Sequence, residues 1–172
     1  MSGVKLGDRV LVLGEDAPLL VSIAVKAGLT GRTCVVVEGE DRAKAAAEAA
    51  EREGALVEAF AAPVTMLPLD GGTFDVVVLR DVLPSLSPER RVACLRETLR
   101  VLRPGGRCLV IDPAARGGLG GLLSRRGQDQ FYAERGGAPT ALQAEGFRAV
   151  RTVAEREGLL FVEGVKAVTA HT

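Results

Sequence analysis

Histidine is nearly absent from this sequence, because the single one is His171, one residue from the end. Hydrolases with a Ser-His-Asp triad and zinc sites with histidine ligands need imidazole groups that the fold brings to one place. One histidine at the end of the sequence cannot supply them. We therefore exclude both classes and expect no metal site.

Cysteine is also scarce. Cys34, Cys94 and Cys108 are odd in number, lie far apart and form no C-x-x-C pair. Disulfides persist in oxidising compartments, whereas isolated cysteines are typical of proteins that stay reduced. We therefore expect three buried thiols, with no disulfide among them, and a cytoplasmic location.

An excess of charge of either sign is missing, since 22 basic residues balance 22 acidic ones. Nucleic acids and anionic membranes attract proteins with excess positive charge, so we expect neither as the main partner. The sequence also lacks an apolar run of about 18 residues, the length that a membrane-spanning helix needs. Residues 1–7 lack the apolar core of a signal peptide, and we expect them to form a short tail.

The length of 172 residues predicts one domain spanning residues 1–172. Its most informative stretch runs from Thr73 to Asp112. A continuous apolar run at 74–79 predicts a strand, and Ser87 and the proline after it predict the start of a helix. Apolar residues then recur at helical spacing until a Pro-Gly-Gly turn, which leads into a second apolar strand. A strand, a helix and a strand in this order form a right-handed crossover in a parallel sheet.

The same patterns predict the elements before this stretch. Strands are expected at 8–14, 33–38 and, as a weaker edge strand, 55–60; helices are expected at 18–27 and 41–53. Asp16 and Asp41 are the predicted N-caps of the two helices. The first helix is apolar almost all round, so we expect it to be heavily buried.

The C-terminal part shows two β-like runs, 147–155 and 159–168, which follow a short helix that starts at Pro139. Only three residues join the two runs, so they predict a hairpin. Residues 113–137 hold seven glycines and four arginines with little periodicity, which predicts a loop or short-helix insertion. The Gly117–Gly121 run lacks the Lys-Ser/Thr ending of a phosphate-binding loop, so a mobile loop is the simpler interpretation.

The segment Leu99–Ile111 resembles the R-V-L-(K/R)-P-G-G segment of class I S-adenosylmethionine (SAM) methyltransferases. The strand Phe74–Val78 and its spacing from that segment resemble the same family. The resemblance extends over roughly residues 8–168 and is closest to the small-molecule branch that includes quinone-biosynthesis methyltransferases. It implies a doubly wound, mostly parallel, seven-stranded α/β sheet of Rossmann-like type. Its seventh strand would be antiparallel and would lie between strands five and six, whereas a dinucleotide-binding domain continues with parallel strands.

The family carries an acidic residue and three glycines around its first turn, and this sequence retains only Gly14 of that set. Val12 occupies the acidic position, and Asp16 and Pro18 occupy the other two glycine positions. Gly14 and Glu15 either contact SAM or belong to an ordinary capped turn between a strand and a helix. Carboxylates at this helix start would repel a pyrophosphate but favour a sulfonium cation, which argues against NAD or FAD.

Other positions of the family pattern are retained in part. Glu38 ends the second strand, where an acid accepts hydrogen bonds from a ribose diol, or it is a solvated carboxylate. The adjacent Gly39 stands where a bulky adenine contact is usual. Pro63 replaces an acid that meets the adenine, although the backbone amide of Val64 could still reach the ring. Leu79, at the end of the fourth strand, completes the predicted cofactor-binding set.

For chemistry, Asp81 is the carboxylate that we nominate as a general base, with a loop acid or ion-pair partner as the simpler alternative. Asp112 closes the fifth strand on the same rim. Tyr132, the sole tyrosine, has either a substrate role or a surface-packing role, and the second is the simpler expectation.

The sequence therefore predicts a SAM-dependent methyltransferase that acts on a small molecule. The alternative is a methyltransferase-like binding or assembly module whose SAM site has decayed; a nicotinamide oxidoreductase ranks third. We expect residues 113–137 to order over the ligand as a lid, or to pack against a second copy of the chain or another protein. The substrate itself cannot be read from the sequence, because substrate residues lie on variable loops.

Overall fold

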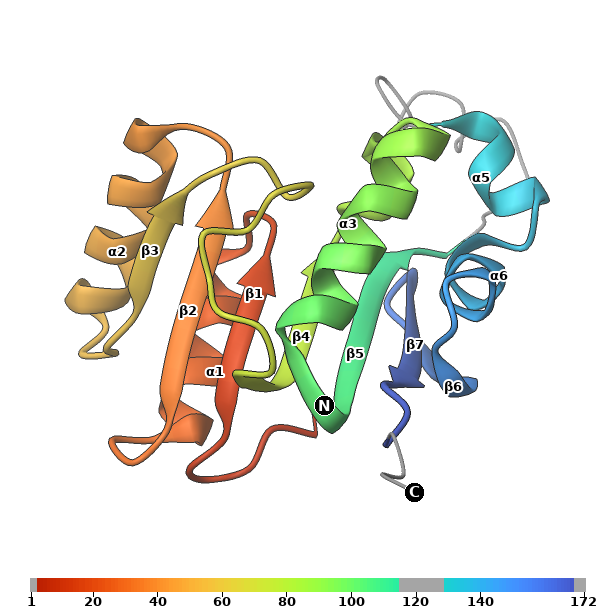
Figure 1. The fold of residues 1–172 in the computed structure, drawn as a ribbon. Coiled ribbons are helices and arrows are strands. Elements are labelled where there is room, and N and C mark those ends of the chain that lie inside the picture. Colours follow the sequence, from red (N-terminus) through yellow and green to blue (C-terminus); the bar gives the residue numbers. More distant parts are fainter. Residues whose placement is uncertain (1–2, 115–128, 169–172) are drawn as a thin grey trace.

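The computed structural model describes residues 3–114 and 129–168, which form one seven-stranded sheet with helices on both faces (Figure 1). The strands are β1 (Arg9–Leu13), β2 (Arg32–Val37), β3 (Glu58–Ala61), β4 (Phe74–Arg80), β5 (Leu102–Pro113), β6 (Arg148–Arg156) and β7 (Leu159–Val165). The helices are α1 (Ala17–Ala27), α2 (Glu40–Arg52), α3 (Pro88–Val101), α5 (Gln130–Glu134) and α6 (Gly137–Ala144), with a short 3-10 turn, η1, at Leu83–Ser85.

The strand order is β3-β2-β1-β4-β5-β7-β6. The first five strands in this order pair in parallel, while β7 pairs antiparallel with both β5 and β6. The predicted doubly wound sheet and its inserted seventh strand are therefore confirmed. The hairpin connection at Glu157 and Gly158 has positive φ at both residues, which is the type I′ turn that matches strand twist.

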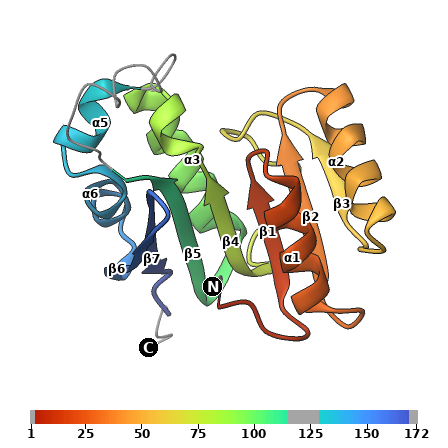
Figure 2. The same ribbon diagram turned by 180° about the vertical axis from the view of Figure 1, so that it is seen from behind.

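Two separate hydrophobic clusters fill the two faces of the sheet. One cluster joins β1, β2 and β4 to α1 and α2. The other joins the opposite faces of these strands and β5 to α3, α5 and α6. Figures 1 and 2 show this division from opposite sides, with α1 in front of the sheet in one view and α3 in front of it in the other. Because helices cover both faces of these strands, successive side chains are all apolar, and the strands could be predicted from their continuous apolar runs.

The predicted N-caps of α1 and α2 and the predicted burial of α1 can be compared with the structure. Asp16 caps α1 as predicted, since its Oδ1 accepts a hydrogen bond from the Leu19 amide at 2.9 Å. The N-cap of α2 is Gly39 rather than Asp41, and no side chain caps that helix. The expectation that α1 is heavily buried was wrong for its outer face, where Val25 is 64% exposed. Only one side of α1 faces the sheet, because no further layer lies outside it in the described part of the chain.

Two strand boundaries also differ from the prediction. The edge strand β3 is confirmed as an edge but begins at Glu58, three residues later than expected. The Pro-Gly-Gly segment expected to be a turn lies inside β5, which starts at Leu102. It stays extended because Phe74 pairs with Leu102 and because Lys166, just beyond β7, bonds to the backbone of both glycines.

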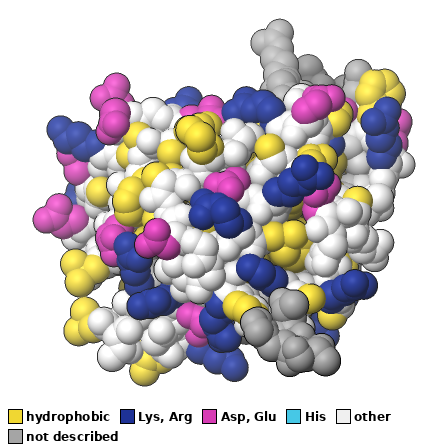
Figure 3. Space-filling view, in the orientation of Figure 1, with side chains coloured by type: hydrophobic (Ala, Val, Ile, Leu, Met, Phe, Trp, Pro, Cys, Tyr) yellow, Lys and Arg dark blue, Asp and Glu magenta, His cyan; other side chains and the backbone are white. Residues whose placement is uncertain are grey.

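The middle of the predicted 113–137 insertion lies outside the described residues, as does the glycine run at 117–121. Of its described parts, Pro113 ends β5, and α5 and the start of α6 supply short helices. Every helix that the structure describes is too short or too polar to cross a lipid bilayer. Acidic and basic side chains are interspersed over the face seen in Figure 3.

Candidate functional site

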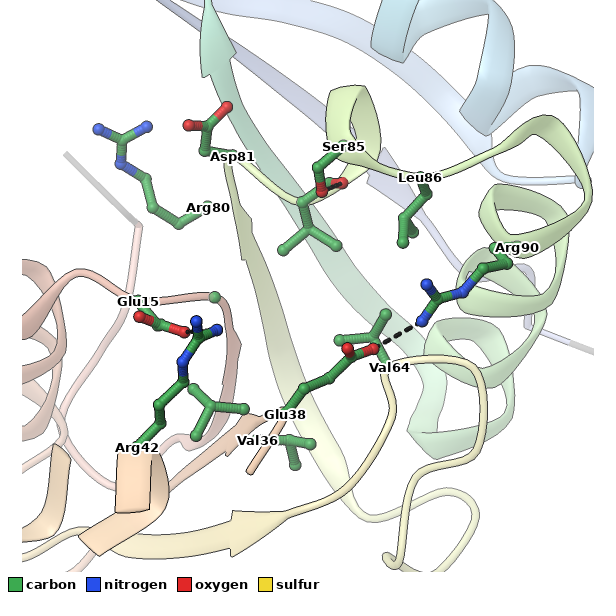
Figure 4. A pocket seen from close by; sticks show the side chains of 13 residues that line it. Glu15, Val36, Glu38, Arg42, Val64, Arg80, Asp81, Ser85, Leu86 and Arg90 are labelled. Atoms are coloured by element: carbon green, nitrogen blue, oxygen red, sulfur yellow. Dashed lines mark hydrogen bonds and ion pairs between the residues drawn. The ribbon is translucent and has the colours of Figure 1, made fainter. Parts of the chain in front are cut away.

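A pocket of about 360 Å³ lies at the carboxyl ends of β1, β2 and β4. In doubly wound sheets this edge is where ligands bind. The turn after β1 forms one side, Glu38 and α2 form a second, and the segment from Arg80 through η1 to α3 forms a third (Figure 4). Of the predicted site residues, five line it: Gly14, Glu15, Glu38, Val64 and Asp81.

Gly14 is fixed by its neighbours in the fold. Its φ is +110°, and a Cβ at this position would lie 2.3 Å from the carbonyl oxygen of Arg80. The β1 turn therefore packs directly against the end of β4. Asp16 ties the same two segments together, because it caps α1 and also accepts a hydrogen bond from Nε of Arg80 at 3.0 Å. The cap by Asp16 is thus present, and the same turn borders the pocket, so the cap and a contact with SAM are compatible.

Two ion pairs lie at the open side of the pocket. Arg90, in the first turn of α3, reaches Glu38 at 2.6 Å, and Arg42, on α2, reaches Glu15 at 2.7 Å (Figure 4). All four side chains are about half exposed or more. Pairs as exposed as these typically contribute less than about 1 kcal/mol, so a ligand can replace them.

The part of the pocket beside Glu38 is open and partly apolar. Gly39 has φ of +106°, and a Cβ added there would meet no atom within 4 Å, so a ligand can approach this backbone closely. Val64 and Leu86 add apolar surface to the pocket. Leu79, by contrast, is fully buried in the core, so its side chain does not form part of the pocket wall.

Asp81 occupies a strained position on the pocket wall. Its φ is +57°, which is unusual for a residue with a side chain, and such strain often marks functional sites. Its amide donates to the carbonyl of Ile111 at 2.9 Å, which anchors it to β5. Burial raises the pKa of its carboxyl above the usual value of 3.8, while the neighbouring Arg80 acts to lower it.

Asp112 and Tyr132 form a buried hydrogen bond behind this rim. The Tyr132 hydroxyl donates to Oδ2 of Asp112 at 2.9 Å, and the Arg91 guanidinium lies 4.3 Å from the centre of the tyrosine ring. The expectation that Tyr132 packs on the surface was therefore wrong, because its hydroxyl finds a carboxylate partner inside the protein. Burial raises the pKa of Asp112 to about 7, with Tyr132 opposing that shift.

Three arginines line the pocket and were not among the site residues predicted from the sequence: Arg42, Arg80 and Arg90. Each was visible as a charged residue at the start of a helix or the end of a strand. What the sequence could not show is which carboxylate each one meets, because the pairs join segments far apart in the chain. The three cysteines are buried free thiols, as predicted. Within the described ranges, no cluster of His, Cys, Asp or Glu could hold a metal ion.

The site fits the adenosine part of SAM by three observations. Glu38 ends β2 with a half-exposed carboxylate, Gly39 leaves open space beside it, and apolar side chains lie across the pocket. A carboxylate that can accept two hydrogen bonds suits a ribose diol, and apolar walls suit an adenine ring. The acidic Glu15 at the β1 turn is compatible with the positive charge of a sulfonium.

Comparison with known proteins gives the family. A model of the methyltransferase domain matches residues 20–110. A ubiquinone/menaquinone biosynthesis C-methyltransferase from Escherichia fergusonii is 32% identical over 114 residues, which are 64% of this chain and 45% of that protein. The chain thus spans about half the length of the curated relatives that it matches.

Solved structures share the fold. A SAM-dependent methyltransferase from Aquifex aeolicus superimposes with a TM-score of 0.77 at 23% identity, covering 96% of this chain and 85% of that one. The mitomycin 7-O-methyltransferase MmcR gives a TM-score of 0.75 at 21% identity, covering 96% of this chain and 50% of that one. With the family model matching more than half of its residues, the chain belongs to the class I SAM-dependent methyltransferase family.

Proposed function

We propose that this chain binds SAM in the pocket beside Glu38 and transfers its methyl group to a small molecule. The observation that carries the proposal is the position of Glu38 at the end of β2, next to open backbone at Gly39. The family model and the curated relatives support the cofactor and the reaction type.

Each pocket residue then has a defined role. Glu38 would accept hydrogen bonds from the ribose hydroxyls after it leaves Arg90. Val64 in the pocket lining and Gly39, which follows Glu38 just outside that lining, would border the adenine, and Gly14 and Glu15 would face the methionine end. When bound, SAM supplies an electrophilic methyl group on a sulfonium.

Asp81 would accept a proton from the methyl acceptor. Its place on the pocket wall and its raised pKa, caused first by burial, support this role. Positioning of the acceptor supplies much of the rate enhancement in reactions of this kind, so the reaction does not need a histidine.

Isothermal titration calorimetry with SAM, S-adenosylhomocysteine and NADH tests the cofactor. We expect both sulfur ligands to bind in the micromolar to millimolar range, about −8 to −4 kcal/mol, because the glycine pattern of the first turn is reduced. Tight binding of NADH would overturn the proposal. Binding of none of the three would favour the alternative, a binding or assembly module without a cofactor.

A matched pair of variants tests the site. Glu38→Gln removes the carboxylate charge and should weaken S-adenosylhomocysteine binding about tenfold, because hydrogen bonds to a charged acceptor are the stronger kind. Glu40→Gln makes the same change at an exposed residue on α2 outside the pocket lining. If both variants bind like the unaltered protein, Glu38 does not hold the ribose.

We also propose a cytoplasmic location, supported by the three free cysteines. Burial raises the pKa of the Cys34 thiol to about 11 and that of Cys94 to about 12, so both thiols stay protonated at neutral pH and are poor nucleophiles. Residues 113–137 remain the segment that we expect to meet the substrate or a protein partner. Hydrogen exchange of that segment with and without S-adenosylhomocysteine tests this expectation.

A further inference from the structure

Two carboxyl groups lie on neighbouring strand ends at the rim of the sheet. Arg80 and Ile111 are paired residues of β4 and β5, and each carboxyl belongs to the next residue, Asp81 or Asp112. The hydrogen bond from the Asp81 amide to the Ile111 carbonyl holds the two ends together. Asp81 lines the pocket, whereas Asp112 is only 3% exposed. One carboxyl therefore lies in the pocket wall and the other inside the protein beside it.

The two oxygens of Asp112 have different surroundings. Oδ2 accepts the hydrogen bond from Tyr132, while Oδ1 is buried and accepts no hydrogen bond within the described part of the chain. Buried carboxylate oxygens nearly always have a hydrogen-bond partner, so Oδ1 of Asp112 is an exception that needs a physical explanation. A carboxylate oxygen in this situation is a ready acceptor for a proton.

Among the described residues, β7 places the apolar Leu159 and Leu160 beside Asp112, and the ionisable groups near it lie on β4, β5, α3 and α5. Burial and the negative charge of Asp81 raise the pKa of Asp112 to about 7, whereas the hydrogen bond from Tyr132 lowers it. The other ionisable groups that face it are Arg80 at the end of β4, Arg91 on α3 and Cys108 on β5 itself. Asp112 is the more deeply buried of the two carboxyls, so desolvation favours the neutral form of Asp112 more strongly than that of Asp81.

We propose that Asp112 is the second proton acceptor of the site, and that it receives at Oδ1 the proton that Asp81 takes from the methyl acceptor. In this step the O–H bond of protonated Asp81 breaks and an O–H bond forms at Oδ1. The electron pair stays on Asp81, which is a carboxylate again, and Asp112 becomes neutral. This inference rests on the proposed role of Asp81 in the reaction.

Tyr132 is the positioning residue of this pair. Its hydroxyl occupies Oδ2, which leaves Oδ1 as the oxygen that can take the proton. The tyrosine is held in turn by Arg91, whose guanidinium also donates to the carbonyls of Leu83 and Leu86 at 3.0 and 2.8 Å. Because Leu86 lines the pocket, the same arginine connects the pocket wall to the buried pair.

Carbon-13 NMR of the aspartate carboxyls, followed from about pH 4 to about pH 9, tests the proposal without any methyl acceptor. The Asp112 signal is the one that is lost in Asp112→Asn. We expect the titration of this carboxyl to have its midpoint near pH 7. Asp81→Asn should lower that midpoint by roughly one pH unit, because a neighbouring negative charge is removed. Tyr132→Phe should raise it, because a hydrogen bond to the charged form is lost.

Two further variants serve as controls. Asp81→Gly also removes the charge and relaxes the positive φ, so it replaces the asparagine variant if that variant is unstable. Asp70→Asn makes the same charge change in an exposed loop before β4, at the opposite end of that strand, and should leave the Asp112 midpoint in place.

Either of two results overturns the proposal: an Asp112 midpoint below about pH 5, or a midpoint that removal of the Asp81 charge does not move. If the hydrogen bond between Tyr132 and Asp112 has only a structural role, removal of the Asp81 charge will leave the Asp112 midpoint in place. S-adenosylhomocysteine binding is measured on the same samples. If S-adenosylhomocysteine does not bind, the proposed function is wrong. If it binds but the two carboxyls are not coupled, only the proposal about Asp112 is wrong.

Discussion

The two halves of the pocket rim hold their charged groups in opposite ways. At the ends of β1 and β2, Glu15 and Glu38 are exposed and each meets an arginine across the open pocket. At the ends of β4 and β5, Asp81 is anchored by its amide to the Ile111 carbonyl and Asp112 is buried, and the pKa values of both carboxyls are raised. The first half can exchange partners at little cost, which suits reversible binding of a cofactor. The second half keeps a fixed geometry, which suits proton transfer.

The adjacent arginines Arg90 and Arg91 give the largest expected contrast. Arg91→Ala leaves the Leu86 carbonyl without its guanidinium donor, takes one of two donors from the Leu83 carbonyl and removes the ion pair with Asp129, so it should lower the free energy of unfolding by about 3 to 4 kcal/mol. Arg90→Ala removes an exposed ion pair and should change it by less than about 0.5 kcal/mol. Urea unfolding at neutral pH measures both. Equal effects would remove the distinction between the two halves.

The second contrast lies within the β1–β2 half. Gly14→Ala places a Cβ against the Arg80 carbonyl at positive φ and should destabilise the protein by about 2 to 3 kcal/mol. Gly39→Ala has the same backbone strain but open space around it, so we expect about 1 kcal/mol. Thermal unfolding distinguishes them. A tolerated Gly14→Ala would mean that the β1 turn is as adaptable as the surface beside Glu38.

Asp112 should make stability depend on pH. Because its pKa is raised from 3.8 to about 7 in the folded protein, the favoured neutral form is lost as the pH rises through that range. The free energy of unfolding should therefore fall by about 2 kcal/mol between about pH 5 and pH 8 through this group. Asp112→Asn should flatten this part of the profile, with Asp70→Asn as the matched control. An unchanged slope in Asp112→Asn would show that the carboxyl titrates normally.

The smallest effect concerns the cofactor half itself. Arg90→Ala frees Glu38 from its partner and should tighten S-adenosylhomocysteine binding by about two- to fivefold, in line with the modest strength of exposed pairs. Arg96→Ala, on the same helix but paired with Glu145, is the control. Weaker binding in Arg90→Ala would instead make Arg90 a ligand-binding residue.

Much of the fold was predictable because each buried strand carries a continuous apolar run and because turns are marked by glycine and proline. The inserted β7 followed from the short connection between the last two runs together with the family resemblance. The start of β5 was not predictable, since pairing with β4 and bonds from Lys166 keep an apparent turn extended. Tertiary contacts, rather than local preference, decide such a segment.

The candidate site was predictable where position alone defines it. Residues that follow the parallel strands, such as Gly14, Glu38 and Asp81, lie at the same edge of the sheet because of their position in the strand order alone. The partners of these residues were not predictable, because Arg90 reaches Glu38 and Tyr132 reaches Asp112 only through the packing of helices on the sheet. Val12 illustrates the same limit: it is fully buried against α1, so its side chain serves the core.

The insertion of β7 between β5 and β6 also has a consequence for folding during synthesis. Until residues 159–165 have left the ribosome, β5 has an unpaired edge, although its partner β4 is already available. At roughly 5 to 20 residues per second, that edge waits for several seconds. An apolar strand with a free edge can pair with another chain, so this interval is when the nascent protein is most prone to aggregate. Because Asp112 lies on this late-completed edge, the buried carboxyl site forms among the last parts of the molecule.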